Sequence, residues 1–225
     1  ELGCFLKLIE EPKMMDSKPH ERFTGLFSTA YFAPISYYRE VVKYRSIYID
    51  KYENYLKQTF RNRCVICSAN GPLALSIPVV KTSGNHTPVK DIHIDYSKPW
   101  QRTHLRAMES AYRCSPFFEH YHDELKRLYE QKFDLLLDFN TCLNVFITRC
   151  LKCDFELMFT ENYIKNSEGI IDFRNSFTKR SIKNIEMPRY FQVFENKFGF
   201  IPDLSIIDLL FNEGKHSLAY IKSIA

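Results

Sequence analysis

The sequence contains little glycine, 7 in 225 residues, and no long apolar run. So little glycine argues against a repetitive or disordered architecture. No run approaches the roughly 20 apolar residues that a helix needs to cross a bilayer. The short apolar stretch near the start is interrupted by charge and does not resemble a secretory signal. We therefore expect a globular protein without membrane insertion.

The common catalytic signatures are missing as well. The sequence contains no Walker loop, no G-x-G-x-x-G, no H-E-x-x-H and no G-x-S-x-G. These absences exclude the enzyme classes that such motifs mark, although they do not exclude enzymes in general. No cofactor is predicted.

A strong excess of one charge is the third absence. The net charge is +4 and the isoelectric point is about 8.6. Nucleic-acid-binding domains usually cluster their Lys and Arg and have an isoelectric point above about 9. We expect no nucleic-acid partner. The weak positive charge is compatible with a pocket for a phosphorylated small molecule.

The cysteines indicate a reducing compartment. Seven is an odd number, and no compact disulfide framework is visible, so a cytoplasmic location is expected. Two Cys-x-x-Cys pairs, Cys64/Cys67 and Cys150/Cys153, lie far apart in the chain and lack the Gly or Pro of a metal knuckle. We predict buried free thiols and no metal site.

Aromatic residues, by contrast, are plentiful at 15%. They are consistent with a hydrophobic core rich in aromatic side chains, or with a site that stacks flat rings or sugar faces. Residues 1–25 read as an N-terminal extension without periodicity, and 26–225 as a single domain. A strand-like run at 26–32, a helical pattern at 36–44 and a second short strand at 47–49 outline a βαβ unit.

The rest of the chain predicts a hairpin followed by helices. Strand-like segments flank Asn70-Gly71, a strong hairpin turn signal. A helix is expected over 100–114, a second from a cap at Ser115-Pro116 to about 132, and a third over 133–151. A polar, irregular stretch at 160–189 precedes a last helix that ends near Gly214. The predicted fold is therefore mixed α/β, with a partly parallel sheet flanked by helices and a helix-rich second half.

The basic segment around Lys57, Arg61, Asn62 and Arg63 is the first candidate site. If the segment is extended, Lys57, Arg61 and Arg63 share one face, because side chains alternate along a strand. A phosphate or diphosphate would relieve the repulsion between these cations. The alternative is a solvated charged segment whose cations pair with Glu53 and Asp50.

The second candidate is His104, which falls on one helical face with Trp100, Met108 and Ala111. A histidine on such a stripe is either a hydrogen-bonded core residue or a general acid or base that faces a cleft.

The third candidate is Asp208, which forms a narrow polar stripe with Ser205 and Asn212 on an otherwise apolar helix. In a pocket walled by Ile and Leu, its carboxyl would have the raised pKa that a general base needs. Exposure of the stripe to solvent is the alternative. We predict that His104, Asp208 and at least one of Arg61 and Arg63 border one pocket.

With these segments in view, the order of motifs resembles the WbqC-like protein family over about residues 26 to 218. The matching motifs are S-T-A-Y-F-A-P (28–34), E-x-Y-x-K-Q-x-x-R-N-R-C (53–64), G-P-L-A-L-S-I-P-V (71–79), the segment from Trp100 to His104, A-Y-x-x-S-P-F-F-E (111–119), L-D-F-N (137–140), D-F-R (172–174), Y-F-Q-V-F (190–194) and L-S-I-I-D-L-L-F-N (204–212). Leu105 stands where the family pattern has an aromatic residue, so a pocket there would differ.

The resemblance implies work on O-antigen-type surface polysaccharides in bacteria. The leading hypothesis is a transferase that moves a group to or from a sugar, in particular a nucleotide-linked amino sugar. The basic segment would hold phosphate, Tyr31, Trp100 and Asn212 would contact the substrate, and His104 with Asp208 would handle protons. The alternative is a non-catalytic accessory protein that binds a glycan precursor or another polysaccharide-assembly enzyme.

Overall fold

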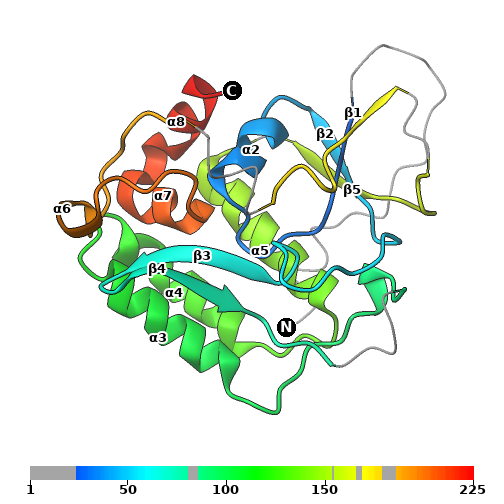
Figure 1. Cartoon of the computed structure of the whole chain (residues 1–225), viewed down its shortest axis with the longest axis horizontal. Coiled ribbons are helices and arrows are strands. Elements are labelled where there is room, and N and C mark those ends of the chain that lie inside the picture. The colour runs from blue at the N-terminus through cyan, green and yellow to red at the C-terminus, as the bar shows by residue number, and fades with distance from the viewer. Residues whose placement is uncertain (1–23, 81–85, 154, 166–168, 179–185) are drawn as a thin grey trace.

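A computed structural model describes residues 24–80, 86–153, 155–165, 169–178 and 186–225. The N-terminal extension expected over 1–25 therefore lies almost entirely outside the described residues. Figure 1 shows a sheet and a hairpin on opposite sides of a central helix, with the C-terminal helices packed at one end.

The main sheet has four strands, all parallel, in the order β5-β2-β1-β6. Its strands are β1 (Thr24–Phe27), β2 (Ser46–Ile49), β5 (Glu156–Phe159) and β6 (Ile170–Asp172). Helix α2 (Ile35–Val41) connects β1 to β2, because parallel neighbours need a crossover. The βαβ unit and the mixed α/β class predicted from the sequence are confirmed.

A two-stranded hairpin forms the second sheet. Strands β3 (Arg63–Ser68) and β4 (Gly71–Ser76) pair antiparallel, with Ser68 opposite Gly71. Gly71 has a φ of 95°, a backbone conformation that glycine adopts without strain. The predicted Asn70-Gly71 turn is confirmed. A 3₁₀ turn, η1 (Val89–Asp91), follows on the way to the helices.

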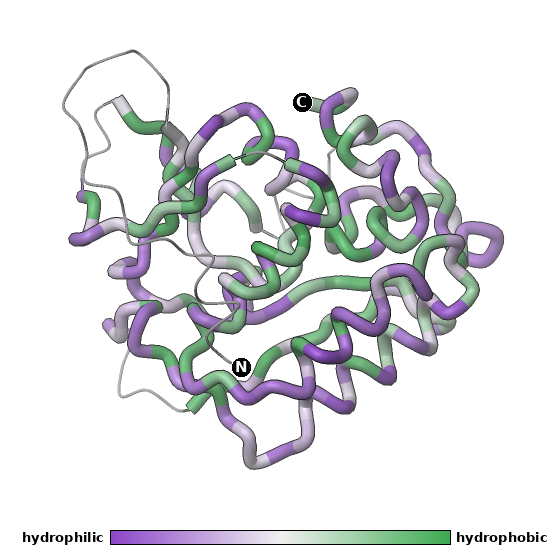
Figure 2. The backbone as a smooth tube through the Cα atoms, turned by 180° about the vertical axis from the view of Figure 1, so that it is seen from behind, coloured by the Kyte–Doolittle hydropathy of each residue, from purple (hydrophilic) through white to green (hydrophobic). Residues whose placement is uncertain are grey.

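Three long helices make up the helix-rich half: α3 (Trp100–Tyr112), α4 (Phe118–Glu130) and α5 (Leu136–Leu151). In Figure 2 the tube alternates between hydrophilic and hydrophobic along α3 and α4, as expected for helices with one face on the core. The predicted cap at Ser115-Pro116 is wrong. Helix α4 begins at Phe118, and the amide of Phe117 instead donates to the carbonyl of Phe211, 3.0 Å away.

The C-terminal part contains α6 (Glu195–Phe198), α7 (Ile206–Glu213), η3 (Gly214–His216) and α8 (Ser217–Ser223). The predicted end of α7 at Gly214 is confirmed, whereas η3 and α8 were not expected. The start of α2 is capped from this region: Asp203 accepts hydrogen bonds from the amide and the hydroxyl of Ser36, both at 2.7 Å. A carboxylate at a helix N-terminus stabilises the helix, so Asp203 joins α2 to α7.

One aromatic-rich core connects these elements. Its largest buried side chains come from every part of the described chain and include Phe27, Tyr31, Tyr112, Phe139 and Phe211. The high aromatic content is therefore largely a matter of packing. The polar stretch expected to be irregular at 160–189 does contain a strand, β6, which pairs with β1.

Gly214→Ala should destabilise the protein more than Gly199→Ala. Both glycines have positive φ, 53° and 71°, so both substitutions strain the backbone. At Gly214 a new Cβ would also lie 2.4 Å from the ring of Phe117, whereas no described atom lies within 4 Å of a Cβ at Gly199. Overpacking of this kind costs about 1–3 kcal/mol, measured as the difference in unfolding free energy between the two variants. Equal losses would mean that Phe117 moves aside freely.

Candidate functional site

A polar residue follows the carboxyl end of each strand in the main sheet. Ser28 follows β1, Asp50 follows β2, Thr160 follows β5, and Arg174 comes two residues after β6. In open parallel sheets, ligands bind outside the carboxyl ends of the strands. These residues, with Glu53, Arg61 and Asp172, are called the carboxyl-end cluster below.

Arg61 and Glu53 form one half of the cluster. The Nε and Nη2 atoms of Arg61 lie 2.8 and 2.5 Å from the two carboxylate oxygens of Glu53. Ser28 Oγ lies 2.7 Å from Nη2 of Arg61 and 3.0 Å from Oε2 of Glu53. Both charged side chains are about 95% buried. Burial raises the pKa of the Glu53 carboxyl, and the hydrogen bond from Arg61 opposes this rise.

Arg174 organises the other half. Its Nη1 lies 2.6 Å from Oδ2 of the fully buried Asp50, and its Nη2 lies 2.5 Å from Oδ2 of Asp172. Thr160 Oγ1 donates to Oδ1 of Asp50 at 3.1 Å. The two outer strands of the sheet are β5 and β6. Thr160, after β5, and Arg174, after β6, both bind Asp50 at the end of β2.

The two halves meet at Ser28 and the backbone of Arg174. The carbonyl of Arg174 accepts from Ser28 Oγ at 2.9 Å and from Nη2 of Arg61 at 3.3 Å. Three carboxylates face two guanidinium groups in the ion pairs of this cluster. With all five groups charged, the cluster carries one net negative charge.

The basic segment does not adopt the extended conformation that would place its cations on one face. Residues 57–62 form turns, and only Arg63 belongs to a strand. Lys57 is exposed, Arg61 points into the ion pair with Glu53, and Nε of Arg63 donates to Ser76 Oγ at 2.9 Å. Asn62 is buried and donates to the carbonyl of Ile77. The pairing with Glu53, given above as the alternative, holds for Arg61.

His104 lies in a buried aromatic network. Its Nδ1 is 2.8 Å from the hydroxyl of Tyr31, which also contacts the hydroxyl of Tyr129, and its ring packs against Trp100. Burial lowers the pKa of His104 to about 4, although a hydrogen bond to the backbone of Ser76 opposes this. The imidazole is therefore neutral at pH 7. Tyr31 and Trp100 are themselves buried at 0% and 5% exposure.

Asp208 lies in a second buried network. Tyr112 donates to its Oδ2 and Tyr190 to its Oδ1, both at 2.7 Å. Asn212 donates to the backbone carbonyl of Asp208 at 2.8 Å. Burial raises the pKa of Asp208 to about 6, and the hydrogen bonds from Tyr190 and Tyr112 limit the rise. The polar stripe of α7 thus faces the protein interior.

The His104 and Asp208 networks both use α3. His104 and Tyr112 are eight residues apart on this helix, which corresponds to about 12 Å along its axis. Within the described residues, no hydrogen bond joins His104 to Asp208 or either of them to Arg61. Their shared proton-handling role stays a prediction, and the carboxyl-end cluster is the more direct candidate.

The sequence patterns did not indicate Ser28, Thr160, Asp172 and Arg174 as site residues, and they indicated Glu53 and Asp50 only as counter-ions. The available signal was a polar residue just after each short apolar run, which marks the carboxyl edge once the strands are known to be parallel. Arg174 was hidden because it lies in the stretch without periodicity.

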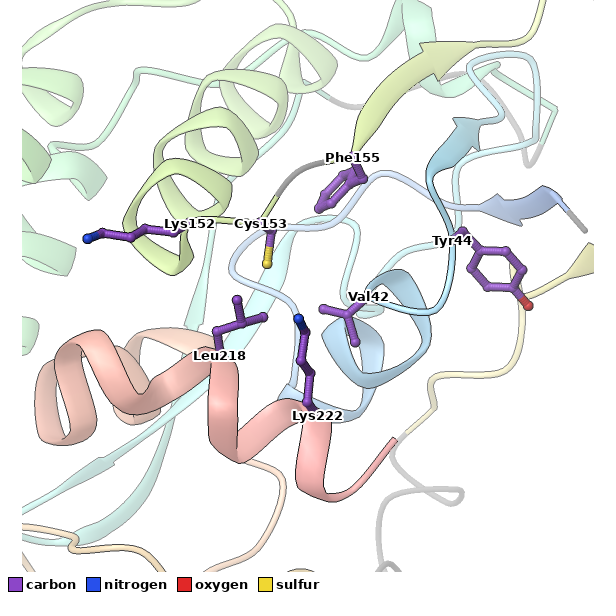
Figure 3. A pocket seen from close by; sticks show the side chains of 7 residues that line it. All are labelled: Val42, Tyr44, Lys152, Cys153, Phe155, Leu218 and Lys222. Carbon is purple, nitrogen blue, oxygen red and sulfur yellow. The ribbon is translucent and has the colours of Figure 1, made fainter. Parts of the chain in front are cut away.

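A pocket of about 190 Å³ lies elsewhere, next to the amino ends of β2 and β5. Figure 3 shows Lys222 reaching from α8 toward the thiol of Cys153, with Val42 nearby, while Lys152 points away. Burial raises the pKa of Cys153 to about 11, which Lys222 partly offsets, so the thiol is a poor nucleophile. Across the described ranges, no group of three or more His, Cys, Asp or Glu side chains could hold a metal ion.

These features define a mixed α/β protein with a charged cluster at the carboxyl edge of a parallel sheet. The model of the WbqC-like protein family matches residues 29–182, and the chain belongs to this family. No curated protein and no solved structure matches the chain. None of the helices in the described part is long and apolar enough to cross a membrane.

Asp208→Asn should flatten the pH dependence of stability. The carboxyl pKa is about 6 in the folded protein against an ordinary value of 3.8. The stabilising contribution of the protonated form is therefore complete below about pH 4 and is lost as pH rises through 6. Relative to the variant, the wild type should lose up to about 3 kcal/mol over this range, measured by urea unfolding.

The control for this comparison is Asp123→Asn, which changes an exposed aspartate on α4. Its stability should follow that of the wild type at each pH. Parallel curves for the wild type and Asp208→Asn would contradict a raised pKa at Asp208.

Arg61→Ala should lower the free energy of unfolding by about 3–5 kcal/mol, because it leaves the buried Glu53 carboxylate without its cation. Lys57→Ala, in the same segment but exposed, should change it by no more than about 0.5 kcal/mol. Chemical unfolding of both variants tests the difference. Similar small losses would rule out a buried ion pair at Arg61.

Proposed function

We propose that this protein is a cytoplasmic group-transfer enzyme of bacterial surface polysaccharide biosynthesis that acts on a sugar or a nucleotide-linked amino sugar. Membership of the WbqC-like family supports this class of pathway. The observation that carries the proposal is the convergence of three carboxylates and two guanidinium groups at the carboxyl ends of four parallel strands. Ligands of open parallel sheets bind at this edge.

The charge of the carboxyl-end cluster favours the acceptor end of the substrate. One net negative charge attracts the ammonium group of an amino sugar and repels a phosphate. The phosphates of a nucleotide would then lie to one side. The Nζ atoms of Lys51 and Lys90 lie over the ring of Tyr52, 5.5 and 5.4 Å from its centre, and the amide of Tyr52 donates to Asp50. These lysines, with the exposed Lys57, are the proposed phosphate contacts.

Glu53 is the proposed proton acceptor among the three carboxylates. Asp50 is fully buried, and the hydrogen bond from Arg174 lowers the pKa of Asp172, which makes it a weak base. Burial raises the pKa of Glu53 above its ordinary value, and Glu53 contacts the hydroxyl of Ser28. Transfer to an amine or hydroxyl requires a base within hydrogen-bond reach of the proton that leaves. His104 and Asp208 are the alternative pair for this role.

The alternative function is a non-catalytic protein that binds a glycan precursor or another polysaccharide-assembly enzyme. One observation favours it: the ionisable groups of the carboxyl-end cluster and of the Asp208 network are hydrogen-bonded to protein groups. A network whose ionisable groups are all hydrogen-bonded within the protein can bind and orient a ligand. Catalysis, by contrast, requires that one of these hydrogen bonds open.

Glu53→Gln should abolish transfer while it preserves binding. The wild type is incubated with a uridine-diphosphate-linked amino sugar and with acyl-thioester or aminoacyl donors, and mass spectrometry follows the mass gained by the sugar. Loss of a general base lowers the rate by about 10²–10⁴-fold. The amide keeps the size of the carboxylate and one oxygen that can accept from Arg61, and the proposed phosphate contacts lie on other residues. The thermal shift with the nucleotide sugar, measured against the variant's own melting temperature, should therefore remain.

His104→Gln and Asp208→Asn are the matched comparisons, since both residues are buried and hydrogen-bonded like Glu53. Loss of transfer in these variants, with Glu53→Gln active, would assign the base to His104 and Asp208. A thermal shift without turnover for any donor would instead support the non-catalytic function.

A further inference from the structure

The loop after β5 carries an exposed aromatic ring at the edge of the carboxyl-end cluster. Tyr163 is 55% exposed, and it lies four residues beyond the last residue of β5. The centre of its ring is 5.1 Å from Cζ of Arg174. The guanidinium thus occupies one side of the ring, and the exposure of the side chain comes from the remaining surface.

The guanidinium under this ring is held firmly. Arg174 makes a hydrogen bond of 2.6 Å to Asp50 and several to Asp172, the shortest at 2.5 Å, and its side chain is only 8% exposed. An aromatic ring that stacks on a fixed cation gains a cation–π attraction and loses little freedom when a ligand binds. Tyr163 is therefore a preorganised flat surface, in contrast to an isolated tyrosine on a loop.

Asp172 adds hydrogen-bond acceptors beside this surface. Its side chain is 32% exposed, although both of its oxygens accept from Arg174. Each carboxylate oxygen can accept more than one hydrogen bond, so Asp172 can also receive hydroxyl or ammonium donors from a ligand. Asp172 and Tyr163 contact the same guanidinium, which keeps the two side chains close to each other.

We propose that Tyr163 and Asp172 form the subsite that holds the pyranose ring of the acceptor, an amino sugar, in the transfer reaction proposed above. A pyranose has a face of C–H bonds that packs on an aromatic ring and a rim of hydroxyls that donate to a carboxylate. The net negative charge of the carboxyl-end cluster favours a sugar with an ammonium group over one with a carboxylate. The role of this sugar as the acceptor rests on the proposed function, whereas the binding of an amino sugar by Tyr163 and Asp172 can be tested on its own.

The probes are the methyl glycosides of glucosamine, glucose and glucuronic acid, together with uridine monophosphate. Saturation-transfer NMR and titration should show the glucosaminide binding most tightly, the glucoside less tightly and the glucuronide least. The uridine probe should not compete with the glucosaminide. Competition by the uridine probe, or a preference for the glucuronide, would overturn the assignment because the surface would then hold a nucleobase or an acidic group.

Tyr163→Ala should weaken glucosaminide binding by about tenfold, as expected for a stacked aromatic contact. Tyr163→Phe should bind like the wild type, because the ring rather than the hydroxyl carries the contact. Phe191→Ala is the matched control, since Phe191 is similarly exposed, at 52%, and belongs to a different segment. Unchanged binding in Tyr163→Ala, or an equal loss in Phe191→Ala, would overturn the subsite.

Asp172→Asn separates the ammonium contact from stacking. This change should weaken binding of the glucosaminide more than binding of the glucoside. Circular dichroism checks that the variant keeps the fold. Equal effects on both sugars would overturn the role of the carboxylate.

The failure of this inference and the failure of the proposed function give different results. Glycoside binding that depends on Tyr163, without transfer for any donor, would refute the enzyme and keep the subsite. Transfer with the same kcat/KM in the wild type and in Tyr163→Ala would refute the subsite and keep the enzyme.

Discussion

The buried carboxylate of Asp50 is the constraint on which the carboxyl edge of the sheet depends. A fully buried charge is unfavourable unless other groups compensate for it, and this carboxylate lies directly after the second strand. Arg174 and Thr160 supply the compensation from beyond the two outer strands. Those strands have three and four residues, too few for backbone pairing alone to hold them firmly. The charge that must be neutralised therefore also fixes the ends of the sheet.

The fold could be predicted to the extent that local signals agree with tertiary packing. The parallel β1–α2–β2 unit follows from an apolar run, a proline turn and a second apolar run, and Asn70-Gly71 marks the hairpin. The start of α4 could not be predicted, because Phe117 bonds to Phe211 from a distant helix. Ser115 therefore competes with a long-range contact that no local pattern reveals.

The candidate site was less accessible to prediction because its partners come from separate parts of the chain. The polar stripe of α7 indicated that Asp208 matters, but its hydroxyl donors, Tyr112 and Tyr190, belong to other segments, and no local pattern marks them as its partners. The sequence left open whether Arg61 binds an anion or pairs with Glu53, and in the fold Glu53, eight residues earlier, neutralises it inside the protein. The sequence alone does not show whether a charged residue is paired with an opposite charge inside the folded protein.

This distinction separates the two kinds of polar group in the molecule. The His104 and Asp208 networks are enclosed by aromatic side chains from the core, so their hydrogen bonds fix how α3, α7 and the β1 end pack. The carboxyl-end cluster differs because its ion pairs continue outward, from the fully buried Asp50 through Arg174 to the partly exposed Asp172. Buried ion pairs are often no more stabilising than apolar side chains of the same size. A chain of them leads here from the core to the surface at the carboxyl edge of a parallel sheet, which is the edge where ligands of open parallel sheets bind.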